Sequence, residues 1–366
     1  VGIKIAAGSV NDLAGNASPV AEFVSATTKL DTQAPTAPTV TTTAPAKTNT
    51  LPVVATITFA EPVTGFDSTD LSILGTATGC QISVAAVSAT VYTATITGCT
   101  DGTVGLSIAA NSVTDAASNL GPVVPAPTPV LTTIDRAAPT ATAALANAMA
   151  FTNTMPIPFV VTFAEPVTGV TAADFDVIGT ATGCQVSVTS VSSTVYNVAV
   201  SSCAADGTVG VKVLAAAATD NAGNTGPATV VSSATVVLDT IAPDAPTVAD
   251  MPGDFTAATE IDPIFEMDAR FTYECEFDGG PVSCGAGNLH LGSVANPLAL
   301  GDHELKIWVT DQAGNRSQPF SQTWNIGNYD TPAVPDAPVV ERPIRTTLDV
   351  SWTEPTSSVE IPVVGY

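Results

Sequence analysis

The chain has 366 residues, of which 45% are hydrophobic and only 5% aromatic, and it contains 28 Pro and 27 Gly. This length predicts several domains, and abundant small, β-branched and turn-forming residues predict short strands rather than helices. Its 34 acidic residues against 10 Lys and Arg give a net charge of −24. That charge excludes a basic nucleic-acid-binding surface and docking on anionic lipid, and it suits an extracellular protein or one that takes up divalent cations.

The first 33 residues match the last third of a repeat that follows. Residues 1–5 align with residues 104–108, and Asp31 aligns with Asp135. We therefore expect residues 1–33 to be the C-terminal strands of a truncated domain. Partial expression of a longer polypeptide is one explanation, and donation of these strands to a neighbouring chain is the alternative.

An internal repeat of 104 residues organises the next part of the chain. The segment Phe-Ala-Glu-Pro-Val-Thr-Gly at 59–65 recurs unchanged at 163–169, and Gly-Thr-Ala-Thr-Gly-Cys-Gln at 75–81 recurs at 179–185. One residue is inserted near Ala204, so that Asp115 corresponds to Asp220. These offsets predict two complete domains, at 34–137 and 138–241.

The repeats read as strands joined by turns. Segments 91–97 and 195–200 alternate apolar and polar residues, as half-buried strands do. The pattern Asp-x-Ala-[Gly/Ser]-Asn, which begins at Asp12, Asp115, Asp220 and Asp311, lies between alternating segments and predicts a strand–turn–strand unit. About seven such strands per 100 residues predict an all-β fold of tandem Greek-key sandwiches. Ala-Pro linkers at 34–35, 138–139 and 242–243 restrict the backbone, which favours an elongated rod.

Two further modules follow the repeats. Residues 242–329 lack the Phe-Ala-Glu-Pro segment but keep the hairpin at 308–315, which predicts a divergent sandwich. After the Pro-rich stretch 330–338, residues 332–366 begin a different module.

The six cysteines form three local pairs. Two pairs flank an alternating hairpin and the third flanks a turn sequence, which predicts the disulfides Cys80–Cys99, Cys184–Cys203 and Cys275–Cys284. Free buried thiols are the alternative. Disulfides indicate an oxidising compartment, either the periplasm or the cell exterior.

Three short signatures carry a family resemblance: the 59–65 segment, the Asp-x-Ala-Gly-Asn hairpin and Asp-Thr-x-Ala-Pro. Together they resemble the bacterial Ig-like repeats of large surface adhesins and biofilm-associated proteins, over residues 1–241. Residues 271–326 resemble another bacterial Ig-like module. Residues 336–366 resemble the first strands of a fibronectin type III domain, with Trp352 and Tyr366 at that family's core aromatic positions. The resemblance implies stalk, spacer and adhesion roles and names no ligand.

The sequence offers no catalytic constellation. Its two histidines, His290 and His303, have no counterpart in the repeats, and no nucleophile–base motif, zinc-type spacing or phosphate-binding loop is present. Isopeptide cross-links would need a Lys in every copy, but Lys4 and Lys212 align with Ser107 in the middle copy. We therefore expect a protein that is not an enzyme.

Calcium at the domain junctions is the sharpest site hypothesis. In an Ig-like sandwich, the end of the second strand, the penultimate hairpin and the entering linker meet at one pole. The carboxylates expected at the first junction are Asp31, Glu61, Asp70 and Asp115, and those at the second are Asp135, Glu165, Asp174 and Asp220. Ca²⁺ takes six to eight oxygen ligands and would stiffen such a hinge. Calcium between Ig-like repeats of related adhesins supports the idea, while Asx turns and strand-end hydrogen bonds are the alternative.

We expect the chain to be a structural stalk or adhesive segment of a large secreted or cell-surface bacterial protein, holding a binding tip away from the cell. The alternatives are a subunit of a self-assembling extracellular filament and an accessory segment of a secreted hydrolase. The expected partners are a surface receptor, a glycan, matrix, or copies of the chain itself. No apolar run approaches the ~18 residues that span a bilayer.

Overall fold

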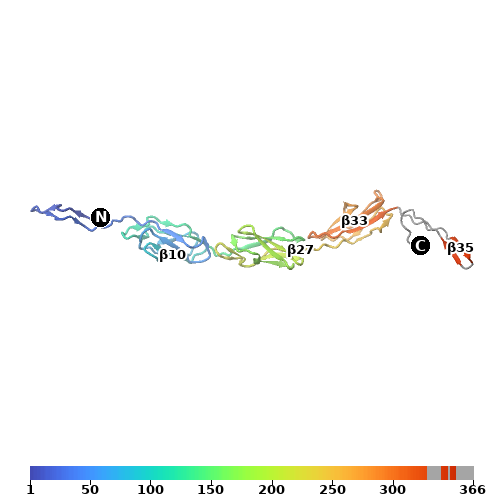
Figure 1. Ribbon diagram of the computed structural model, residues 1–366, viewed down its shortest axis with the longest axis horizontal. Coiled ribbons are helices and arrows are strands. Elements are labelled where there is room, and N and C mark those ends of the chain that lie inside the picture. Colours follow the sequence, from blue (N-terminus) through green and yellow to red (C-terminus); the bar gives the residue numbers. More distant parts are fainter. Residues whose placement is uncertain (328–338, 345–346, 352–366) are drawn as a thin grey trace.

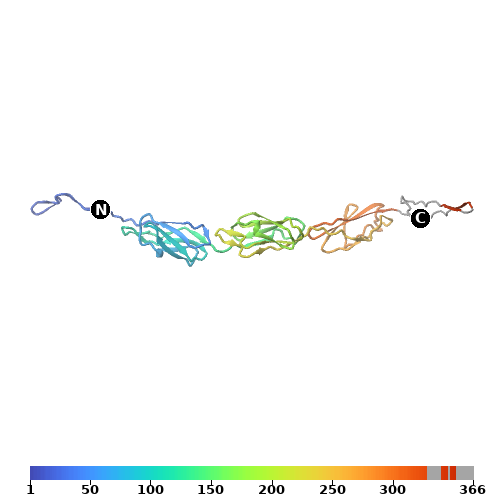
Figure 2. The same cartoon turned by 60° about the horizontal axis from the view of Figure 1, so that its bottom comes forward.

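The structure, a computed structural model, describes residues 1–327, 339–344 and 347–351. These residues form β-strands and two one-turn 3-10 helices, with no α-helix among them, so the predicted all-β class is confirmed. Figure 1 and Figure 2 show three β-domains that follow one another along the chain, between a thin N-terminal segment and the β35 hairpin. Each of the three has its own hydrophobic core.

The first repeat domain is a sandwich of two sheets. One sheet has the order β5-β7-β10-β9; the other has the order β14-β11-β15-β6, with β8 paired to β11. Its elements are β5 (Thr39–Thr42), β6 (Lys47–Thr48), β7 (Val53–Thr58), η1 (Ser68–Asp70), β8 (Leu71–Leu74), β9 (Gln81–Ala86), β10 (Val91–Thr97), β11 (Gly102–Ile108), β12 (Val113–Thr114), β13 (Leu120–Gly121), β14 (Ala126–Pro127) and β15 (Thr132–Ile134). The split into a four-stranded sheet and a facing sheet is the immunoglobulin-like arrangement.

The second repeat domain has the same plan. Its sheets have the orders β16-β18-β22-β21 and β17-β27-β23-β20, with β26 paired to β23. Its elements are β16 (Ala141–Leu145), β17 (Phe151–Thr152), β18 (Ile157–Phe163), β19 (Val167–Thr168), η2 (Ala172–Asp174), β20 (Phe175–Gly179), β21 (Gln185–Ser190), β22 (Val195–Ser201), β23 (Gly207–Val213), β24 (Ala218–Asp220), β25 (Thr225–Gly226), β26 (Val231–Ser232) and β27 (Val236–Leu238). In both domains the last strand pairs in parallel with a short early strand, β15 with β6 and β27 with β17.

Strand alternation explains the cores of the repeats. In β7 and β10 every second residue is buried, so that one face of the sheet packs inward and the other meets solvent. The buried Tyr92 and Tyr196 hydroxyls donate to the carbonyls of Val63 and Val167, at 3.0 and 3.3 Å. These bonds satisfy the hydroxyl of each ring, and they hold the segment that follows β7 or β18 against the core.

The third domain is built around one larger sheet. Its sheets have the orders β29-β34-β33-β31-β32 and β28-β30. Its strands are β28 (Val248–Ala249), β29 (Phe255–Thr256), β30 (Ile264–Phe265), β31 (Thr272–Phe277), β32 (Gly280–Val282), β33 (Gly301–Thr310) and β34 (Phe320–Ile326). The core has fewer members than the cores of the repeats and includes Cys275 and Trp324.

The segments outside these domains are small. In residues 1–30, β1 (Lys4–Ile5) pairs with β4 (Phe23–Val24), and β2 (Val10–Asn11) pairs with β3 (Ala17–Ser18). Toward the other end, β35 (Val339–Ile344) and β36 (Thr347–Ser351) form an antiparallel hairpin. Trp352 and Tyr366, on which the fibronectin type III resemblance depends, lie outside the described residues.

The structure contains all three predicted disulfides: Cys80–Cys99, Cys184–Cys203 and Cys275–Cys284. The first two close the mouths of the β9–β10 and β21–β22 hairpins, and the third links β31 to the residues just after β32. The first pair spans 19 residues, a loop closure nominally worth about 3 kcal/mol.

Candidate metal centres at the domain junctions

One hairpin turn has the same hydrogen bonds in all four places where its sequence occurs. Around Asp220, Oδ1 accepts from the backbone N–H of Ala222 and of Asn224, both at 2.8 Å, and Oδ2 accepts from Asn224 Nδ2 at 2.8 Å. The same three bonds form around Asp12, Asp115 and Asp311. A carboxylate that satisfies two backbone donors fixes the turn.

In three of the four turns, the asparagine that ends the turn also bonds to the linker entering its domain. Asn119 Nδ2 donates to the carbonyl of Asp31 at 3.2 Å, Asn224 Nδ2 to that of Asp135 at 2.9 Å, and Asn315 Nδ2 to that of Asp239 at 2.8 Å. The turn therefore serves as a clamp on the preceding linker, and we call this bond the linker clamp.

The next linker residue is tied to the preceding domain. Arg136 donates from Nη1 to Asp101 Oδ1 at 2.8 Å and from Nη2 to the carbonyl of Cys99 at 2.9 Å. At the third junction, Thr240 N donates to Asp206 Oδ2 at 2.7 Å. Two consecutive linker residues therefore hold the two flanking domains, at both the second and the third junction.

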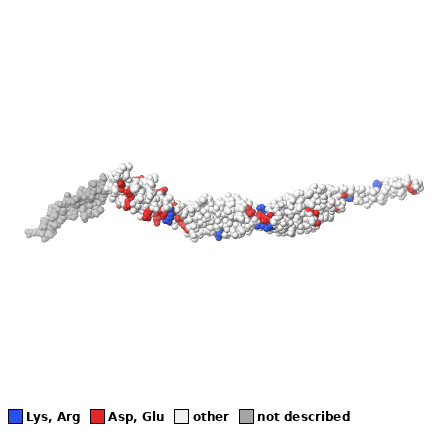
Figure 3. All heavy atoms as spheres, turned by 180° about the vertical axis from the view of Figure 1, so that it is seen from behind, with Lys and Arg blue, Asp and Glu red and all other residues white. Residues whose placement is uncertain are grey.

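The first two junctions bring three carboxylates together. The trio Asp31, Glu61 and Asp115 and the trio Asp135, Glu165 and Asp220 each place one oxygen per residue within 4.8 Å of the others. Each trio takes one residue from the linker, one from the loop after β7 or β18, and one from the hairpin turn. Figure 3 shows the repeat domains as largely white surfaces, with acidic and basic residues gathered where the domains meet.

The structure places the other two expected ligands elsewhere, which corrects the predicted site. Asp70 Oδ2 accepts from Asp67 N at 2.8 Å, and Asp174 Oδ2 accepts from Thr171 N at 2.7 Å. Each carboxylate closes a capping box on its own 3-10 helix, η1 or η2. This local bond satisfies an orphan backbone donor, so neither side chain joins its trio.

The second trio shows the electrostatic cost of the arrangement. Burial raises the pKa of Glu165, and the negative charges of Asp135 and Asp220 raise it further, whereas Lys47 opposes them. Lys47 belongs to β6 of the first repeat, and its Nζ lies 3.6 Å from Asp135 Oδ2. Burial opposes ionisation of Asp220 as well, but its hydrogen bonds from Asn224, Ala222 and Gly223 lower its pKa. A bound cation would relieve the repulsion on Glu165.

The third junction keeps the linker clamp without the trio. Asp311 has the same turn bonds as Asp220, but no comparable group of three carboxylates forms there among residues 1–327. The Phe-Ala-Glu-Pro segment that supplies Glu61 and Glu165 is missing from this domain. Clamp and trio are therefore separable features.

The sequence did not predict the direct contacts between one domain and the hairpin turn of the next. Asn49 N donates to the carbonyl of Ala222 at 3.1 Å, and a Cβ built on Gly223 would lie 3.5 Å from Asn49 Nδ2. A Cβ on Gly314 would meet Asn153 Nδ2 at the same distance. The available signal was the 104-residue offset between Asn49 and Asn153, together with a Gly in the hairpin turn that faces each of them. No local sequence pattern, however, predicts a contact between Asn49 and Ala222, which are 173 residues apart.

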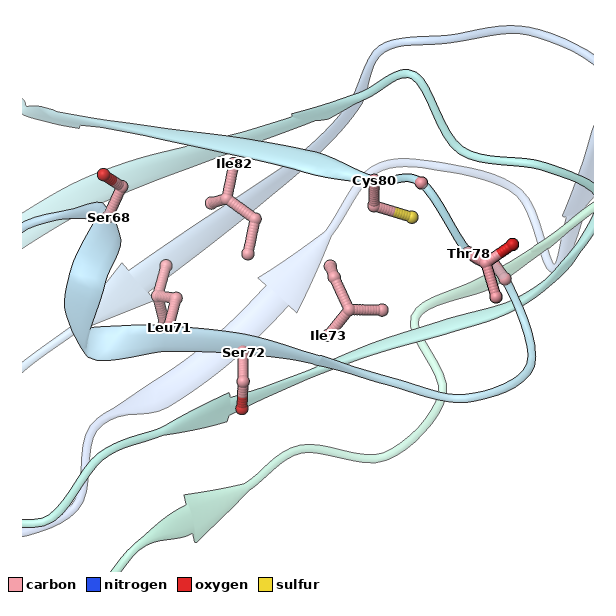
Figure 4. Close-up of a pocket in the computed structure, with 9 residues that line it drawn as sticks. Ser68, Leu71, Ser72, Ile73, Thr78, Cys80 and Ile82 are labelled. Carbon is pink, nitrogen blue, oxygen red and sulfur yellow. The ribbon is translucent and has the colours of Figure 1, made fainter.

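Away from the junctions, a shallow groove lies between β8 and β9 of the first repeat. Figure 4 shows Leu71, Ile73 and Ile82 pointing toward one another there, and Ser68, Ser72 and Thr78 also line it. None of its lining residues is charged, so it offers no acid, base or metal ligand. In the part of the chain that the structure describes, no helix is long and apolar enough to cross a membrane.

Comparison with known proteins places one domain in a family. Residues 31–126 match the bacterial Ig-like domain, so the first repeat, together with the linker residue Asp31, is a bacterial Ig-like domain. The second repeat has the same sheet orders. No curated protein matches the sequence.

Several solved structures are similar in fold alone. Invasin, described as a bacterial integrin-binding protein, is 11% identical, with 83% of this chain and 62% of that one covered and a TM-score of 0.39. The fibronectin(III)-like modules of Clostridium thermocellum CbhA are 15% identical, covering 50% of this chain and 94% of that one, with a TM-score of 0.28. The Yersinia pseudotuberculosis adhesin InvE is 14% identical, covering 84% and 67%, with a TM-score of 0.17.

Proposed function

We propose that this chain is a non-enzymatic stalk or adhesive segment of an exported bacterial surface protein, built to hold a binding tip away from the cell. One observation carries the proposal: consecutive linker residues are bonded to the domains on both sides. At the second junction Arg136 is tied backward to Asp101, and Asp135 is tied forward to Asn224. Neighbouring domains joined by a linker usually move relative to one another. A linker that is hydrogen-bonded to both domains restricts this motion and fixes the orientation of one domain relative to the next.

The remaining features agree with this role. The bacterial Ig-like family of the first repeat and the disulfides suit a chain outside the cytoplasm. The groove between β8 and β9 is lined by uncharged residues. Length and stiffness are the properties that this architecture supplies.

A scattering measurement on the whole chain tests the proposal. Wild type is expected to give an extended distance distribution. Arg136→Ala weakens the backward tie by removing its side-chain bonds and leaving only the bond from residue 136 N to Asp101 Oδ2. It should broaden that distribution without changing the melting of either repeat. Arg270→Ala is the matched control, because Arg270 is exposed and its contacts, with Asp268 and the Phe271 ring, lie within the third domain. A wild-type profile that already fits freely jointed domains would contradict a stiff stalk.

We further propose that the two trios bind Ca²⁺. Ca²⁺ takes six to eight oxygens in flexible geometry, so three carboxylates leave room for carbonyl and water ligands. Asp31, Glu61 and Asp115 would hold one ion, and Asp135, Glu165 and Asp220 the other. Each ion would join a linker to the domain that follows it and reinforce the linker clamp.

Calorimetric titration with CaCl₂ tests the metal sites separately from the stalk. We expect two binding events in wild type and one in Glu61→Gln or Glu165→Gln. Glu304→Gln, in the third domain, should leave both. Absence of binding heat at millimolar calcium would remove the metal from the proposal but leave the stalk, which rests on the protein's own hydrogen bonds.

A further inference from the structure

A histidine lies in the interior of the third domain. His303 of β33 is 7% exposed. Its ring stacks on Phe277 of β31 with centroids 5.3 Å apart, and it lies 5.9 Å from the ring of Trp324 in β34. Of the chain's two histidines, only this one is buried, since the His290 side chain is 77% exposed.

Both ring nitrogens of His303 face hydrogen-bond acceptors. Nδ1 lies 2.7 Å from Asp278 Oδ2, and Nε2 lies 2.8 Å from the carbonyl oxygen of Ala299. A neutral imidazole donates from one nitrogen only, whereas an imidazolium donates from both. With Asp278 ionised, only the charged form satisfies both contacts.

The two acceptors belong to separate segments that His303 joins. Asp278 lies in the turn between β31 and β32, and its Oδ1 accepts from Glu304 N at 2.9 Å. Ala299 ends the long connection that leads into β33. The charged groups acting on the imidazole are Asp278, from that turn, and Asp302, from β33 itself. The packed faces of β31 and β34 contribute the rings of Phe277 and Trp324.

We propose that His303 is a pH-operated latch of the third domain, whose buried imidazolium holds both the 277–280 turn and the segment ending at Ala299 onto β33. Loss of the proton leaves one acceptor without its donor from the ring, so the attachment of one of the two segments to β33 weakens. The ring nitrogen that loses its proton belongs to a side chain that is 7% exposed, and its lone pair then faces an acceptor oxygen. Because a buried polar atom without a hydrogen-bond partner is costly, the domain loosens in alkaline solution. This latch is independent of the junctions.

The direction of the pH effect follows from the same contacts. Burial alone would lower the pKa of His303, but the bonds to Ala299 and Asp278 and the charges of Asp278 and Asp302 outweigh it and raise the pKa. A raised folded-state pKa gives stability that is complete below the unfolded value near 6.5 and is lost as the pH rises through the folded value.

Tryptophan fluorescence of the full chain reports on this domain without a contribution from either repeat. The three tryptophans lie at 308, 324 and 352, after both repeats. We expect the urea midpoint reported by tryptophan to fall between pH 6 and pH 9 in wild type and to be flat in His303→Phe, which keeps the stacked ring. Asp262→Asn, which removes the carboxylate beside exposed His290, should behave as wild type. A flat wild-type midpoint, or an unchanged decline in His303→Phe, would overturn the latch.

Nitrogen-15 NMR gives a second readout, the first part of which needs only the wild-type chain. At pH 6 both ring nitrogens of His303 should be protonated, and Asp278→Asn should move its titration to lower pH. A single neutral tautomer at pH 6, or a titration unmoved by Asp278→Asn, would contradict the proposal.

Discussion

The second and third junctions hold their linkers by the same hydrogen bond but differ in the number of carboxylates around it. Both hold the entering linker by an asparagine amide, Asn224 to Asp135 and Asn315 to Asp239, at nearly equal distances. Only the second adds Glu165 and a carboxylate trio, whose repulsion Lys47 partly offsets. The difference teaches that orientation is set by neutral hydrogen bonds common to both junctions. The trio is an addition that, on the proposed function, would strengthen the junction when it binds a cation.

The largest expected effect comes from removing the carboxylate at the base of the clamp. Asp220→Ala and Asp311→Ala each leave the backbone donors of a turn without their acceptor, and each should cost its domain about 2–3 kcal/mol. Urea unfolding, followed by far-UV CD for the second repeat and by tryptophan fluorescence for the third domain, measures both. Similar losses support a shared clamp, while a loss confined to Asp220→Ala would mean that the trio, not the turn, holds the structure.

A smaller effect should separate clamp from metal. Asn224→Ala and Asn315→Ala each remove the linker clamp, at about 1 kcal/mol apiece. Calcium should restore stability to Asn224→Ala, because an ion bridging Asp135 and Asp220 replaces the lost bond, but not to Asn315→Ala. Thermal melts with calcium and with chelator measure this. Equal rescue of the two variants would show that calcium acts elsewhere.

The smallest expected effect concerns Glu165, whose carboxylate should destabilise the second repeat without calcium and stabilise it with calcium. Its raised pKa means that the folded state holds its proton more tightly than the unfolded state, so metal-free stability falls as the pH rises from about 4.5 through the folded value. Glu165→Gln should therefore slightly raise the urea midpoint of the second repeat at pH 7 in chelator and abolish its gain from calcium. Gln322→Glu, away from the junctions, is a control for a single change of charge. A lower midpoint for Glu165→Gln in chelator would show that the carboxylate is not under repulsion.

The two repeats also show how a core can change without changing the fold. The first packs Phe66 against Phe59 and Tyr92, with ring centroids 5.4 and 5.2 Å apart. The second has Val170 where the first has Phe66, and Phe175 where the first has Leu71. A large ring lost at one position is thus matched by one gained at another, which keeps the core filled. The groove between β8 and β9 lies beside the position where the first repeat has the smaller residue.

Some features are determined by the sequence alone, because their causes lie within a few residues. Strand alternation fixes which side of β7 and β10 is buried, the Asp-x-Ala-Gly-Asn turn satisfies its own backbone donors, and hairpin symmetry brings Cys80 to Cys99. Three of the four carboxylates expected at each junction could be found in the same way, since linker, strand end and hairpin meet at one pole of a sandwich.

Other features were decided only by the tertiary structure, because they depend on competition between partners far apart in the chain. Asp70 and Asp174 had a local use in their capping boxes that outcompeted the distant trio. Arg136 could meet Asp101 only once the first repeat was folded, and Asn49 could meet Ala222 only once the second repeat lay against the first. The ring nitrogens of His303 face acceptors on two other segments, 25 and 4 residues away in the sequence. Spacing predicts which groups can approach one pole, but packing decides which of them are left free to act there.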